Sequence, residues 1–130
     1  MSDTCTRGVR ITVQPRYVPD QSEPDRSHYL FAYQVTIRNE GEETVQLLSR
    51  HWIITNGEGK TEEVRGPGVV GEQPILREGE SFRYTSGCPL TTPSGFMAGT
   101  YQMVDENGDA FEVTIPAFSL DSPHIRRVLN

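Results

Sequence analysis

The sequence predicts an all-β fold, a sandwich of two antiparallel sheets. Apolar and polar residues alternate in several segments, most clearly in Tyr29–Ile37 and Phe111–Ile115. A period of two is typical of strands that bury one face. Turn dipeptides such as Asn107-Gly108 separate these segments, and none of the segments carries the apolar stripe of an amphipathic helix. Short strands divided by turns in this way favour two packed sheets.

The expected elements follow in order along the chain. Alternation predicts a first strand at Val9–Val13 and a second at Tyr29–Ile37. Prolines and polar residues predict a long irregular loop over Pro15–Ser27 and a second loop over Pro89–Ala98. The remaining strands are expected at Val45–Leu48, Trp52–Thr55, Thr61–Arg65, Ser81–Ser86, Gly99–Val104 and Phe111–Ile115. Trp52 shares an apolar face with Ile54, so we expect it in the core.

The length fits one domain. A chain of 130 residues is long enough to bury a sizeable hydrophobic core. We expect a flexible N-terminus over residues 1–6, a single sandwich over 7–120 and a C-terminal tail over 121–130. The tail sequence His124-Ile125-Arg126-Arg127 matches no motif, and its role stays open.

Charge and cysteine content exclude several classes of protein. The net charge of −6 and a sequence isoelectric point near 5.0 argue against nucleic acid and anionic membranes as partners. No apolar run reaches membrane-spanning length, and no secretory signal is evident, so we expect a cytoplasmic protein without membrane insertion. Cys5 and Cys88 are expected to be reduced thiols. A catalytic thiol at Cys88 is disfavoured because its neighbours Gly87 and Pro89 carry no base.

The segment Gly66–Gly71 spells G-x-G-x-x-G, the glycine pattern of dinucleotide-binding loops. In such sites a helix follows the glycines and its N-terminus holds the pyrophosphate. Here Pro74 interrupts any helix, and Pro67 removes one backbone N–H. A nest of backbone amides that binds phosphate remains one interpretation. The other is a β-loop in which glycine is needed for positive φ or close backbone approach.

Candidate metal and catalytic groups are scattered. His28, His51 and His124 show no ligand spacing, and Asp105–Asp109 has the composition but not the register of a calcium loop. We interpret Asp105–Asp109 as an acidic hairpin turn. No G-x-S-x-G elbow or assignable carboxylate pair is present. We therefore expect no metal site, no cofactor and no catalytic residues.

Several segments together resemble the ApaG (CorD) family of small bacterial proteins. They are Phe31-Ala32-Tyr33, Leu47–Ile54, Gly66–Pro74, Tyr84–Leu90, Thr92–Met97 and Gly99–Met103. The resemblance covers roughly Arg7 to Phe118 and implies an immunoglobulin/fibronectin-III-like β-sandwich. It also implies a link to cobalt resistance and magnesium efflux. Similar domains occur in certain F-box proteins and in a DNA-polymerase-delta-interacting protein, a distribution that favours a binding module over an enzyme.

The hypothesis from the sequence is a non-enzymatic protein-interaction module with an unidentified protein partner. The alternative is a nucleotide- or pyrophosphate-binding protein that uses the glycine loop, and an enzyme acting on phosphorylated nucleotides ranks third. Weak anion or nucleotide binding is compatible with the first hypothesis. The expected binding residues are Arg50, His51, Arg65, Gly66, Gly68, Gly71 and Glu72. Arg50 and His51 are neighbours in a strand, so they are expected on opposite faces unless a bulge rotates one of them.

Overall fold

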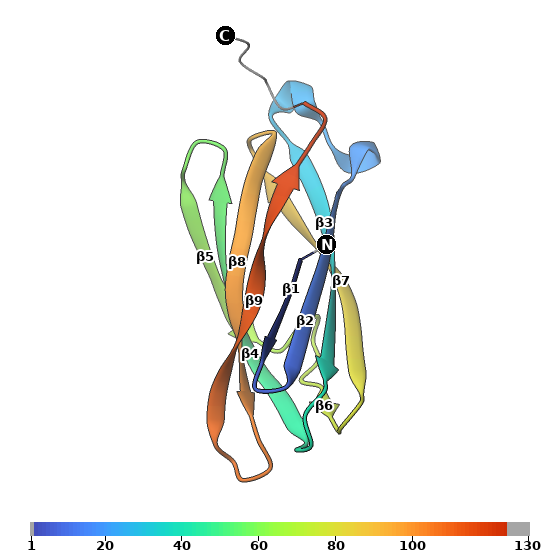
Figure 1. Cartoon of the computed structure of the whole chain (residues 1–130). Helices are drawn as coiled ribbons and strands as arrows, with labels where there is room; N and C mark the ends of the chain where they lie inside the picture. Colours follow the sequence, from blue (N-terminus) through green and yellow to red (C-terminus); the bar gives the residue numbers. More distant parts are fainter. Residues whose placement is uncertain (1, 125–130) are drawn as a thin grey trace.

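The computed structural model describes residues 2–124, which form a sandwich of two antiparallel sheets (Figure 1). The first sheet contains β1 (Ser2–Thr6), β2 (Val9–Tyr17), β3 (Tyr29–Asn39) and β7 (Ser81–Leu90), in that order. The second contains β5 (Thr61–Pro67), β4 (Val45–Asn56), β8 (Ser94–Val104) and β9 (Ala110–Asp121), with β6 (Ile75–Leu76) paired to β4. Two 3₁₀ turns, η1 (Pro19–Gln21) and η2 (Pro24–Arg26), lie between β2 and β3. The predicted all-β sandwich is confirmed.

The core lies between the sheets and follows the predicted alternation. Val9, Ile11 and Val13 of β2 are fully buried, as are Val35 and Ile37 of β3. Burial of alternate residues is what a sheet with one covered face requires. Trp52 is only 3% exposed, so its expected place in the core is confirmed.

The N-terminal half differs from the prediction in two places. Residues 2–6 were expected to be flexible, but they form β1 and pair with residues 9–13 of β2. The loop expected over Pro15–Ser27 is shorter, because β2 continues to Tyr17. Pro15 fits in this strand because β2 at that point pairs with β3, beyond the residues that β1 covers. A strand with one partner tolerates the missing N–H of proline.

The sequence-based prediction placed the boundaries of strands and loops wrongly in two further segments. The expected strands Val45–Leu48 and Trp52–Thr55 are one strand, β4, with a register shift between Leu47 and Ser49. The loop expected over Pro89–Ala98 is mostly strand, because β7 ends at Leu90 and β8 begins at Ser94. β7 is an edge strand, where proline is accepted. The hairpin predicted at Asn107-Gly108 joins β8 and β9 and is confirmed.

The two sides of the sandwich differ. On one side the edge strands β1 and β9 lie together (Figure 1), and Thr4 Oγ1 donates a 2.6 Å hydrogen bond to the carbonyl of Thr114. The amide of Thr114 in turn donates to Thr6 Oγ1. On the other side the edges are β5 and β7. The sandwich is therefore closed along β1 and β9, whereas its second side is bounded by the edges β5 and β7.

The tail expected over 121–130 lies only partly within the described residues. Asp121 belongs to β9, so the sandwich extends one residue past the expected boundary. The ring of His124 packs edge-on against Tyr17, with centroids 5.8 Å apart. Residues 125–130, which include the Arg126-Arg127 pair, lie outside the described residues. Within residues 2–124, no helix has the length and apolar character needed to cross a membrane.

Candidate functional site

A groove opens between the two sheets on the side of β5 and β7. Its volume is about 250 Å³, and strands β3, β4, β5, β7 and β8 contribute to its walls. The apolar part of its lining is Tyr33, Trp52, Ile54, Val64, Cys88 and Met97. Arg50, Glu62 and Ser86 are its polar side chains, and Gly87 and Pro89 of β7 complete the rim. We call this depression the β5–β7 groove.

Arg50 is fixed at one end of this groove by the glycine motif. Its Nη1 atom donates to the carbonyls of Pro67 and Gly68, each at 2.9 Å. The guanidinium lies against Gly66, where an added Cβ would come within 3.0 Å of Nη2. Gly66 is opposite Arg50 in the β4–β5 register. A side chain at position 66 would push the guanidinium away by a few tenths of an ångström, so glycine permits this close approach.

The rest of the motif forms a tight turn. The amides of Val69 and Glu72 each donate to the other residue's carbonyl, at 2.8 and 2.9 Å. Val70 and Gly71 between them both have positive φ, +44° and +81°, as a two-residue type I′ turn requires. Gly68 also has positive φ, and a Cβ there would lie 2.3 Å from the carbonyl oxygen of Glu72. Val69 is fully buried and anchors the turn in the core.

These contacts bear on the phosphate-nest interpretation of the loop. The amide of Gly68 donates to the carbonyl of Leu48, and those of Val69 and Glu72 bond within the turn. Pro67 has no N–H. Pro67, Gly68 and Val69 of the loop, and the adjoining Glu72, thus present no spare amide to a ligand. The geometry agrees with the β-loop interpretation, in which the glycines provide positive φ and close approach.

The expected binding residues separate into three groups. At the end of the groove, Arg50 contacts both Gly66 and Gly68. His51 is in a different place, because it alternates with Arg50 along β4 and its Nε2 atom lies 2.8 Å from Glu63 Oε1. Arg65 joins this second group, with Nη2 3.7 Å from the same Glu63 oxygen. Gly71 and Glu72 lie in the exposed turn.

Aromatic side chains form the floor of the groove. The rings of Tyr33 and Trp52 meet edge to face with centroids 5.3 Å apart. Deeper in the core, the hydroxyls of Tyr84 and Tyr101 are hydrogen-bonded to each other. Burial raises the pKa of Tyr33 and of Tyr84. Hydrogen bonding, to Ser86 and to Tyr101 respectively, acts in the opposite direction, and the positive charge of Arg50 does so more weakly. These hydroxyls therefore stay protonated at neutral pH and serve as neutral hydrogen-bonding groups.

Cys88 is a buried thiol in the groove wall, and Cys5 is exposed. Both are free thiols, as predicted. Burial, followed by the negative charge of Glu62, raises the pKa of Cys88 to about 11. A nucleophilic cysteine needs the opposite, a lowered pKa beside a base or cation. The thiol contributes apolar surface to the groove instead.

The acidic cluster at Asp105–Asp109 is a hairpin turn, as interpreted from the sequence. Asp105 Oδ1 accepts hydrogen bonds from the amides of Asn107 and Asp109, at 2.9 and 3.0 Å. The bond from Asp109 is the main cause that lowers the pKa of Asp105, and Arg7 adds a weaker contribution. Within residues 2–124, no three His, Cys, Asp or Glu side chains are grouped as a metal site would require.

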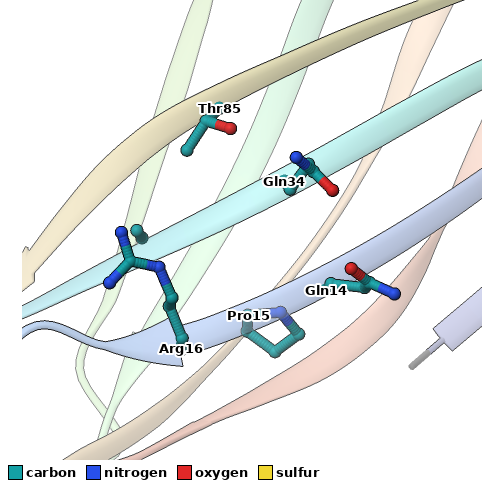
Figure 2. A pocket seen from close by; sticks show the side chains of 6 residues that line it. Gln14, Pro15, Arg16, Gln34 and Thr85 are labelled. Atoms are coloured by element: carbon teal, nitrogen blue, oxygen red, sulfur yellow. The ribbon is translucent and has the colours of Figure 1, made fainter.

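A second depression lies on the outer face of the first sheet (Figure 2). It is larger, about 410 Å³, and Gln14 and Arg16 of β2, Gln34 of β3 and Thr85 of β7 line it. Its side chains are mostly polar and stand on a continuous sheet surface. The β5–β7 groove combines apolar walls with a fixed cation, which is the composition expected of a binding site. We therefore regard the groove as the stronger candidate.

Sequence reasoning missed the groove residues Tyr33, Glu62 and Cys88. Positions 50, 52 and 54 share one face of β4, and 62, 64 and 66 share one face of β5. The alternation alone could have grouped each set. It could not show that β5 and β7 are the free edges on the same side, because strand order is not written in the local pattern.

The fold is the immunoglobulin/fibronectin-III-like β-sandwich, with one closed side and one grooved side.

The sequence model of the ApaG domain family matches residues 19–105 of this chain. The protein ApaG of Beijerinckia indica is 60% identical over 130 residues, which is the full length of both chains. That of Rhodospirillum centenum is 61% identical over 126 residues, 97% of each chain. A crystal structure described as the putative ApaA protein from Bordetella pertussis superimposes with a TM-score of 0.87 at 56% identity, covering 90% of this chain and 95% of that one. The chain belongs to the ApaG family.

Proposed function

We propose that this ApaG-domain protein is a non-enzymatic protein-interaction module of the bacterial cytoplasm, and that its binding site is the β5–β7 groove. The observation that carries the proposal is the combination of apolar walls and a fixed guanidinium on the open side of the sandwich. Fibronectin-III-like sandwiches serve many purposes, so the proposal depends on this site and not on the fold.

The chemistry of the groove supports binding over catalysis. The thiol of Cys88 and the phenol of Tyr33 are held in their protonated forms. The only other ionisable side chains in the lining are Arg50 and Glu62, and the Glu62 carboxylate raises the pKa of the Cys88 thiol, which disfavours an activated nucleophile. An enzyme acting on phosphorylated nucleotides has no support from these residues.

Nucleotide binding by the glycine loop is the weaker alternative. Three of its amides are already bonded within the protein, and Arg50 faces the loop's carbonyls. We expect millimolar or no affinity for ATP or NAD by calorimetric titration. A micromolar affinity that Gly68→Val abolishes would restore this alternative.

We propose that the family's link to cobalt resistance and magnesium efflux is indirect and acts through the protein partner. The side chains that the sequence offered as ligands are engaged elsewhere, His51 with Glu63 and Asp105 with backbone amides. Calorimetry with cobalt and magnesium ions should show no stoichiometric micromolar site. Such a site would replace the indirect link with direct sensing of the cation.

Site-specific photo-crosslinking in bacterial cells tests the interaction function. A photoreactive amino acid replaces Glu62 on the groove rim, and a matched variant carries it at Gln14 on the outer face of β2. Both positions are exposed, so neither change disturbs the core. We expect discrete protein adducts from position 62 and not from position 14. Identical adducts from both positions, or none from either, would contradict the proposal.

A further inference from the structure

The β5–β7 groove carries opposite charges at its two ends. Arg50 lies across from Gly66 of β5, and Glu62 lies four positions earlier on the same strand. At about 3.3 Å per residue, four positions separate the two ends by about 13 Å. Within residues 2–124 neither Arg50 nor Glu62 belongs to a salt bridge. The groove therefore presents an unpaired cation, an apolar centre and an unpaired anion in a row.

The free edge of β7 borders this row. β7 pairs with β3 alone among the strands of its sheet, so one of its edges has no partner strand within the described residues. An exposed edge accepts an additional strand through backbone hydrogen bonds. The facing edge, β5, carries Glu62, Glu63 and Arg65, and charged side chains discourage such pairing. The backbone of a partner segment is thus expected on β7, with its side chains directed across the groove.

The spacing of an extended chain matches the spacing of the charges. Side chains at i, i+2 and i+4 of a strand share one face and span about 13 Å. The first would reach one charged end of the groove, the middle one the apolar walls of Trp52 and Val64, and the last the other charged end. A strand on β7 would close this side of the sandwich as β1 and β9 close the other side.

We propose that the β5–β7 groove binds an extended segment of a partner protein with a basic residue, an apolar residue two positions later and an acidic residue two positions after that. This rests on the proposed function and names the chemistry of the partner. The order of the basic and acidic residues follows if the partner segment pairs antiparallel to β7, which is the slightly more stable arrangement of two strands. β7 runs from Tyr84, whose hydroxyl bonds to that of Tyr101 opposite Arg50, to Cys88, which lines the groove together with Glu62. An antiparallel segment therefore meets Glu62 first and Arg50 last.

The test is a selection of short random peptides displayed on phage against the full chain, followed by affinity measurements by fluorescence anisotropy. We expect enriched sequences with the basic–x–apolar–x–acidic pattern. Glu62→Lys should lower the affinity for such a peptide by about tenfold, because the attraction between Glu62 and the peptide's basic residue becomes a repulsion of similar size. Replacing the peptide's basic residue with Glu should restore binding to this variant.

Glu63→Lys is the matched control, because Glu63 is adjacent in the same strand but belongs to the opposite face with His51. Its affinity for the selected peptide should equal that of the parent protein. Any one of four results would overturn the proposed occupant. They are equal peptide affinity of Glu62→Lys and the parent protein, enrichment of the reversed pattern, enrichment without any shared charge pattern, and occupation of the groove by a second copy of this chain. Protein adducts from position 62 together with such a failure would leave the interaction function intact and reject only the peptide pattern.

Discussion

Replacing Gly68 with alanine separates the two costs that this glycine avoids. At φ +61° an alanine carries the left-handed penalty of about 1–2 kcal/mol. Its Cβ would also lie 2.3 Å from the carbonyl oxygen of Glu72, so the turn has to open. Weakening the hydrogen bond that this oxygen accepts from Val69 adds about 1 kcal/mol. We expect Gly68→Ala to lower the free energy of unfolding by about 2–3 kcal/mol in total.

Gly71 provides the control within the same loop. Its φ is +81°, but a Cβ there has no heavy atom within 4 Å, so Gly71→Ala should cost only the conformational penalty of about 1–2 kcal/mol. Urea denaturation followed by the fluorescence of the single tryptophan, Trp52, measures both variants. The midpoint should fall further for Gly68→Ala than for Gly71→Ala, with unchanged slopes. Equal losses would refute the steric role of Gly68 and reopen the interpretation of the loop as a ligand site.

Three further outcomes follow from the structure. Trp52→Ala should cost about 3–5 kcal/mol in urea denaturation followed by far-UV circular dichroism, because the indole is buried among aromatic rings, and a parent-like midpoint would make it a surface residue. Val70→Asn should raise the free energy of unfolding by about 1 kcal/mol, since Asn before Gly71 suits a type I′ turn and an exposed Val at positive φ does not; a loss would show that Val70 makes a stabilising contact. The raised pKa of Cys88 means that the folded thiol stays protonated from pH 9.0 to about 11 while the unfolded thiol ionises. Stability is therefore fully present below pH 9.0 and falls as pH rises through this window, by up to about 1.4 kcal/mol per pH unit. In Cys88→Ser the loss measured by urea denaturation should be smaller, and an unchanged pH profile would contradict the assignment.

Local patterns were sufficient where a residue's conformation depends on its immediate neighbours. The alternation over Tyr29–Ile37 determined a strand with one buried face, and Asn107-Gly108 determined a hairpin. They failed where a distant partner decides the outcome. Residues 2–6 form a strand because β2 pairs with them, and Pro89 is accepted because β7 lies at an edge.

The candidate site shows the same division. The sequence by itself determined which side chains share a face, so Arg50 was separated from His51, but it left Gly66–Gly71 open between a phosphate nest and a β-loop. Only the tertiary structure decided that Gly66 receives the Arg50 guanidinium and that Glu62 and Cys88 belong to the same groove. The physical reason is that alternation fixes the face of a side chain through the pleat of its own strand. Which strands become edges, and which edges meet, depends on contacts between segments far apart in the chain, and no local pattern encodes those contacts.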